Sequence, residues 1–123
     1  MEKTIEIGGR KYRMRASALI PRLYRAQFGR DLVADMRQLQ QGFMRAAQTA
    51  ENDGAGSNLS AMDLTIFENV AWTLIRNAGE DIPDTPDEWL DSIDGILSIY
   101  KILPQILALW NGNQQTTSTA KKN

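Results

Sequence analysis

Alternation of apolar and polar residues at the start of the chain predicts a β-hairpin over residues 3–14. Gly8-Gly9 separates the two alternating runs, and glycine supplies the positive φ angles that a two-residue turn requires. With this turn, Ile5 lies opposite Tyr12 on the apolar face. A two-stranded sheet is marginal in water by itself. Its apolar face must therefore pack on helices or join another sheet, and the second arrangement would leave an open strand edge for assembly.

Farther along the chain, apolar residues recur every three or four positions, which predicts α-helices. Capping residues, proline at a first helical position and glycine after a last one set the limits of these helices. We expect a compact bundle of four to five helices: one near 17–28, one at 31–50, one from Ser60 to Gly79, a short one from Thr85 and a last one from Asp94 to Trp110.

The first two predicted helices meet at a short corner. Phe28 ends the first helix, and Gly29 is able to take the left-handed conformation that closes a helix. Asp31 follows two residues later, where its carboxylate caps the next helix. These three residues form a structural corner that sets the angle between the two helices.

The second predicted helix carries an apolar stripe that contains Met and Phe. Such a stripe most often belongs to the core. Methionine also adapts to varied apolar surfaces, so the same stripe could form a groove for a partner. The candidate partner-binding residues are Met36, Leu39, Phe43, Met44, Trp89 and Trp110.

Together these elements indicate a mainly α protein of the α+β class. Residues 1–110 are expected to form a single helical domain with an N-terminal hairpin. Residues 111–123 lack apolar periodicity and are rich in Gln, Thr and Ser, so we expect a flexible, disordered C-terminal tail. A polar stretch that contains glycine, residues 51–58, is expected to link the second helix to the third.

Charge is distributed unevenly along the chain, although the net charge is only −1. Residues 1–30 hold eight Lys or Arg and two Glu, a net of +6, whereas residues 51–94 hold eleven acids and one Arg, a net of −10. A basic end suggests nucleic acid; alternatively, the two regions pack or assemble against each other. The candidate self-association residues are Arg22, Arg25, Asp84 and Asp87.

The sequence contains neither cysteine nor histidine. Disulfides, the usual zinc sites and the Ser-His and Cys-His nucleophile pairs are therefore excluded. We expect no enzyme activity, no cofactor and no metal. The N-terminus has no secretory signal, and no apolar stretch is long enough to span a bilayer, so we expect a cytosolic protein without a membrane partner.

Four motifs occur in a characteristic order after the Gly8-Gly9 hairpin. They are Tyr24-Arg25-Ala26-Gln27-Phe28-Gly29-Arg30-Asp31, Val70-Ala71-Trp72, Asp87-Glu88-Trp89-Leu90-Asp91 and Leu103-Pro104-Gln105-Ile106. With this order the chain resembles the tail assembly chaperones of long-tailed bacteriophages and related prophages, over nearly its whole length.

The resemblance implies a transient scaffold that binds the tape measure protein, keeps it soluble and helps to recruit tail tube subunits. It would act in the cytoplasm of the bacterial host and be absent from the mature virion. In several such proteins a ribosomal frameshift adds a C-terminal extension that binds the tube protein, and Lys121-Lys122 is compatible with a slippery codon run. Self-association is also expected, and nucleic acid is not.

Two rival functions remain. A small DNA-binding regulator would use Phe28-Gly29 as a helix–turn–helix corner, but Asp31 and Asp35 lie at the helix end that usually enters the groove. Another phage tail or connector structural protein is the second rival.

Overall fold

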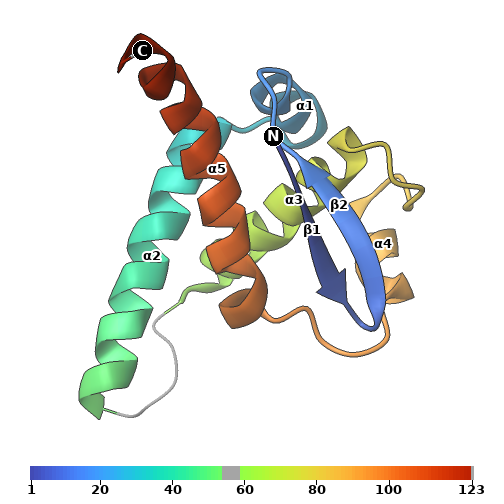
Figure 1. Ribbon diagram of the computed structural model, residues 1–123. Coiled ribbons are helices and arrows are strands. Elements are labelled where there is room, and N and C mark those ends of the chain that lie inside the picture. Colours follow the sequence, from blue (N-terminus) through green and yellow to red (C-terminus); the bar gives the residue numbers. More distant parts are fainter. Residues whose placement is uncertain (54–58, 123) are drawn as a thin grey trace.

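The alternating N-terminal segment forms a two-stranded antiparallel sheet, as predicted. The computed structural model describes the backbone of residues 1–53 and 59–122 and the side chains of residues 1–48 and 59–112. Strands β1 (Glu2–Ile7) and β2 (Arg10–Arg15) are joined by the Gly8-Gly9 turn (Figure 1). Both glycines have positive φ, 58° and 81°. Ile5 pairs with Tyr12, so the predicted register is confirmed.

The predicted corner between the first two helices is also confirmed. Helix α1 (Ile20–Phe28) ends at Gly29, which has a φ of 67° and donates its N–H to the Arg25 carbonyl at 2.8 Å. The Asp31 carboxylate then accepts the Val33 N–H at 3.0 Å, at the start of α2 (Leu32–Asp53). The Phe28 ring lies between Tyr24 and Trp72, at centroid distances of 4.9 and 5.9 Å.

Helix α3 (Ala61–Asn77) is the central element of the fold. It packs against β2 and against each of the other helices, and its side chains are buried without interruption from Val70 to Ile75 (Figure 1). The capping box predicted at its start is present: the Ser60 hydroxyl accepts the Asp63 N–H, and the Asp63 carboxylate accepts the Ser60 N–H. Buried side chains of the hairpin and all five helices form one contiguous core cluster.

Helix α2 approaches α3 closely at Gly42. A Cβ atom at this position would lie 2.5 Å from Oδ2 of Asp63. The absence of a side chain at Gly42 therefore lets the capping carboxylate of α3 sit against α2, where Gln38 also donates to it at 3.3 Å. The glycine that weakens α2 as an isolated helix is required by its contact with α3.

The start of the fourth helix agrees with the prediction, whereas both ends of the last helix differ from it. The Thr85 cap and Pro86 begin helix α4 (Pro86–Ser92), as expected. Helix α5 (Ile99–Lys122) begins at Ile99, so the predicted start at Asp94 is wrong. Gly95 has a φ of 103°, which lies outside helical geometry, so the helix begins only after this residue.

Helix α5 also continues beyond Trp110, the residue at which the apolar pattern predicted its end. Among the side chains of α5 that the structure describes, up to residue 112, Leu109 is the last that is buried, close to where the apolar pattern ends. The side chains of 113–122 and all of Asn123 lie outside the described residues. The predicted linker spans 51–58; α2 continues through 51–53, so that part of the prediction is wrong, and 54–58 lie outside the described residues. The flexible tail stays a prediction.

We predict that Gly29→Val destabilises the protein by about 2 kcal/mol or more, because a β-branched residue is strained at positive φ. Gly29→Asn is the matched control and should lose less, since asparagine tolerates this conformation. Urea unfolding measures both. A Cβ at Gly29 meets no atom within 4 Å, so equal stability of Gly29→Val and wild type would contradict the left-handed cap.

We predict that Gly42→Ala lowers the free energy of unfolding by about 1 kcal/mol or more, although alanine favours a helix. The new methyl group displaces the Asp63 carboxylate and breaks the α3 cap. In an Asp63→Ala background the same substitution should stabilise the protein by roughly 1 kcal/mol. The same sign of effect in both backgrounds would contradict the close approach.

Candidate partner-binding surface

Apolar side chains that remain exposed occur where α2 and α5 lie side by side. The Phe43 ring of α2 lies 6.1 Å from the Tyr100 ring of α5, and Gln40 donates to the Asn111 side chain at 3.3 Å. Next to Phe43 in α2, Met44 is 63% exposed, and Tyr100 is 52% exposed. We call this the α2–α5 surface; its members are Gln40, Phe43, Met44, Tyr100, Trp110 and Asn111.

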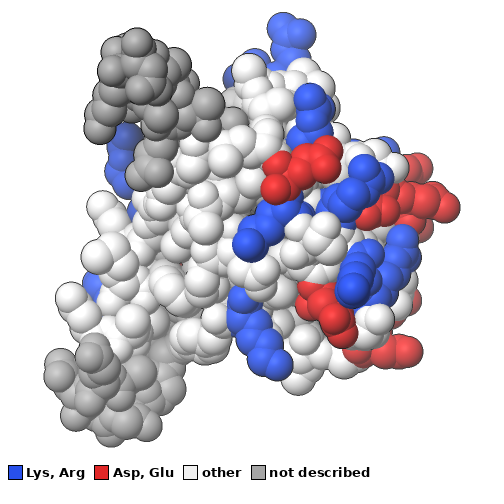
Figure 2. Space-filling view, viewed as in Figure 1, with Lys and Arg blue, Asp and Glu red and all other residues white. Residues whose placement is uncertain are grey.

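This surface is poor in charge. Residues 36–48 and 99–112 contain no acidic residue, and their cations are Arg37, Arg45 and Lys101. In Figure 2, Lys, Arg, Asp and Glu crowd over the hairpin, whereas the surface above α2 and α5 is mostly uncharged. An uncharged surface with exposed aromatic and methionine side chains is typical of the central part of a protein interface.

Only part of the predicted partner-binding set lies on this surface. Phe43 and Trp110 are half-buried and Met44 is exposed, so these three retain surface for a partner. Met36, Leu39 and Trp89 are at most 1% exposed, so the prediction that they contact a partner is wrong. Trp89 instead attaches α4 to the hairpin, with its ring edge-on to Tyr12 at 6.0 Å.

The basic N-terminal strand packs against acidic residues of the same chain. The Glu80 carboxylate accepts the backbone N–H of Arg13 at 2.7 Å and its Nε at 3.4 Å. The hydrogen bond from the Arg13 backbone lowers the pKa of Glu80. Arg10 also donates to the Asp81 carbonyl at 3.4 Å. Of the two interpretations of the charge pattern, packing between the regions accounts for these residues.

The predicted self-association residues stay at the surface. Arg22, Arg25 and Asp87 are exposed. Asp84 is exposed as well and lies 3.3 Å from Arg76, a contact that solvent weakens. The structure places the two arginines on α1 and the two acids at the start of α4, and it does not bring them together within one molecule.

A partly buried ionic network lies at the corner, with Asp35 and Tyr24 buried and Arg30 partly exposed, and the sequence did not indicate it. Asp35 is 4% exposed; it accepts two hydrogen bonds from Arg30, at 2.7 and 2.8 Å, and one from the Tyr24 hydroxyl at 2.8 Å. The hydrogen bonds from Arg30 lower the pKa of Asp35, and burial raises the pKa of Tyr24. A carboxylate five residues after an arginine that directly follows the corner glycine is the only signal that could have suggested the pair.

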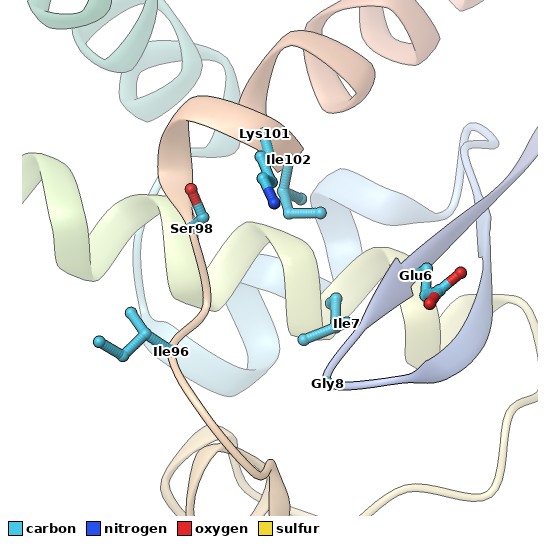
Figure 3. Close-up of a pocket in the computed structure, with 7 residues that line it drawn as sticks. All are labelled: Glu6, Ile7, Gly8, Ile96, Ser98, Lys101 and Ile102. Carbon is cyan, nitrogen blue, oxygen red and sulfur yellow. The ribbon is translucent and has the colours of Figure 1, made fainter.

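We consider two hollows in the described part of the surface, and neither of them collects groups suited to catalysis. One, of about 210 Å³, lies between α1 and α3 beside Leu23, Trp72 and Arg76. The other, of about 130 Å³, lies between the hairpin turn and the start of α5 (Figure 3). The residues with shifted pKa values line neither hollow; they are Tyr24, Arg30, Asp35, Glu68 and Glu80.

Within the described residues, no three acidic side chains come close enough together to hold a metal ion. None of the described helices is both long enough and apolar enough to cross a bilayer. We find no match to this chain among protein-family models, curated proteins or solved structures.

We predict that Asp35→Asn lowers Tm by about 5 °C, because Arg30 loses its ionic partner. The pKa of Asp35 is lowered in the folded state. Its contribution to stability is therefore complete above the ordinary pKa of about 4 and is lost as the pH falls through the folded pKa.

Unfolding measured from pH 7 down to pH 2 should thus show a smaller acid-dependent loss in Asp35→Asn than in wild type. Asp91→Asn, which changes an exposed carboxylate, is the matched control and should keep the wild-type pH dependence. An unchanged acid profile in Asp35→Asn would show that the ionised network does not stabilise the fold.

Proposed function

We propose that this protein is a tail assembly chaperone of a long-tailed bacteriophage or prophage. It would bind helical segments of the tape measure protein through the α2–α5 surface, keep that protein soluble and promote assembly of the tail tube. The observation that carries the proposal is the exposure of Met44 and Tyr100 on a surface without acidic residues.

The chemistry of the α2–α5 surface suits a partner whose helices vary in sequence. Methionine is flexible and polarizable, so Met44 can adapt to differently shaped apolar side chains. The rings of Phe43 and Tyr100 already touch and lose little freedom on binding. Gln40 and Asn111 supply hydrogen bonds of either polarity at the edge of the patch. Helices that lie in apolar grooves are recognised in this way.

The motifs that carry the family resemblance are parts of the fold rather than of this surface. Gly29 closes α1, and Trp89 lies in the core against the hairpin. The family motifs support the proposal because residues that determine the fold would be shared among related chaperones. The partner surface lies on other residues, Met44 and Tyr100 among them, and a surface that meets varied sequences can itself vary.

The geometry disfavours the DNA-binding alternative. A regulator that used the Gly29 corner would need free cations near it, but Arg30 is held in two hydrogen bonds to Asp35. Arg13 donates its backbone N–H to Glu80 at 2.7 Å and its Nε to the same carboxylate at 3.4 Å. The charges that suggested nucleic acid are therefore partly neutralised within the chain.

We predict that Met44→Asp weakens binding of a helical tape measure fragment about tenfold, because a carboxylate would be buried in an apolar interface. Titration calorimetry measures the affinity, and the Tm should stay close to wild type because Met44 is largely exposed. Val33→Asp is the matched control: Val33 is also on α2 and is 44% exposed, but it lies outside the α2–α5 surface. Equal affinities of Met44→Asp and wild type would exclude this surface, and no binding of any fragment by wild type would exclude the function.

A further inference from the structure

The hollow of about 210 Å³ between α1 and α3 has an apolar base and lies apart from the α2–α5 surface. Trp72 and Thr73 of α3 are 5% and 2% exposed, so they form this base. The remaining lining comes from Leu23, Ala26 and Gln27 of α1 and from Arg76 of α3. A cavity of about 150 Å³ is large enough to hold benzene, so this hollow has room for one leucine side chain.

An apolar strip on α1 extends the hollow along the surface. Leu19, Leu23 and Ala26 are spaced at i, i+4 and i+7, so they share one face of the helix. Leu19 already has helical backbone angles, with φ −75° and ψ −22°, and its side chain is 46% exposed. A partner that fills the hollow therefore finds further apolar surface beside it.

The two helix segments that form the hollow carry only positive charge. Residues 20–28 and 69–79 contain no acidic residue, and their charged residues are Arg22, Arg25 and Arg76. Arg22 comes three residues after Leu19 and four before Ala26, so it lies next to the apolar strip. An apolar hollow beside unopposed arginines is complementary to an apolar side chain that has carboxylates next to it.

Arg76 is positioned to bind such a carboxylate. Its guanidinium lies 5.7 Å from the centre of the Trp72 ring, which holds it beside the base of the hollow. Nη1 donates to the Ile82 carbonyl at 3.2 Å and lies 3.3 Å from the Asp84 carboxylate. Nε and Nη2 form no hydrogen bond with any residue that the structure describes. These two nitrogens form the fork that binds a carboxylate through two parallel hydrogen bonds.

The contact with Asp84 does not close this site. The Asp84 side chain is 88% exposed and the Arg76 side chain is 40% exposed, so water weakens their attraction. A partner carboxylate that binds Nε and Nη2 would add to the contacts of Nη1 instead of replacing them. Asp84 nevertheless repels an acidic partner at this position, which gives the site a testable sign.

We propose that the hollow between α1 and α3 binds an acidic peptide segment in which a leucine or another bulky apolar residue is flanked by Asp or Glu. The apolar side chain fills the hollow against Trp72, and a neighbouring carboxylate binds Nε and Nη2 of Arg76. This site goes beyond the proposed chaperone function and does not depend on the α2–α5 surface.

The test is a titration of the isotope-labelled protein with a capped Glu-Glu-Leu-Glu-Asp peptide, followed by NMR. We expect saturable shifts of the Gln27 side-chain amide, the Trp72 indole N–H and the Arg76 Nε–H, while the signals of Phe43 and Tyr100 stay unchanged. Replacing the peptide leucine by serine should weaken binding about tenfold, because the hollow then stays unfilled. Raising the salt concentration should also weaken binding.

Two substitutions beside the hollow should act in opposite directions. Asp84→Asn removes the acid nearest to Arg76 and should tighten binding about threefold, whereas Arg76→Gln removes the fork and should weaken binding about tenfold. Arg37→Gln is the matched control, since Arg37 is exposed on α2 away from the hollow, and it should bind as wild type does. Asp84 is largely exposed, so Asp84→Asn tests the site even if Arg76→Gln does not fold.

Three outcomes would overturn the proposal. One is the absence of saturable shifts at Gln27, Trp72 and Arg76, or shifts confined to Phe43 and Tyr100. Another is equal or tighter binding of a Lys-Lys-Leu-Lys-Lys peptide, which would remove the role of charge. The third is the same set of shifts when the protein is concentrated without peptide, which would assign the hollow to a second copy of the chain.

Discussion

The apolar face of a two-stranded hairpin is not stable when it is exposed to water. The other elements of this fold are arranged so that they cover that face. Ile5, Ile7, Tyr12 and Met14 are all buried. Helix α3 lies against β2, α5 contacts β1, and Trp89 brings α4 onto Tyr12. With the hairpin on one side and the remaining helices around it, α3 becomes the only helix that contacts all four others among those described.

Some of the charges in the N-terminal third contribute to this packing. Arg13 holds Glu80 along the outer edge of β2, and Arg30 holds Asp35 beneath the corner. The first pair joins residues that are 67 positions apart in the sequence, and the second joins residues only five apart. The α2–α5 surface has no ion pair of this kind among the described residues and contains no acidic side chain.

In this molecule, the residues that stabilise the fold differ from those that we assign to partner binding. The residues that are hardest to replace, Gly29, Gly42 and Trp89, are fixed by backbone geometry or by the core. Met44 and Tyr100, which we assign to the partner, are exposed and contribute little to the packed interior. Exposed residues of this kind can change without loss of the fold, as the proposed chaperone function would require.

The sequence by itself determined the local features: the Gly8-Gly9 turn and its register, the Gly29 corner, and the caps at Ser60 and Thr85. Each depends on residues within a few positions of one another, so turn and capping preferences are enough to predict it. Only the tertiary structure decided that Met36 and Trp89 are core whereas Met44 is surface, because periodicity identifies an apolar stripe without showing which part another element covers. It likewise decided the contact of Gly42 with Asp63, which joins two helices, and the pairing of Arg30 with Asp35, which depends on how the corner folds. Interactions between distant residues follow from how the helices pack, and no local preference encodes that.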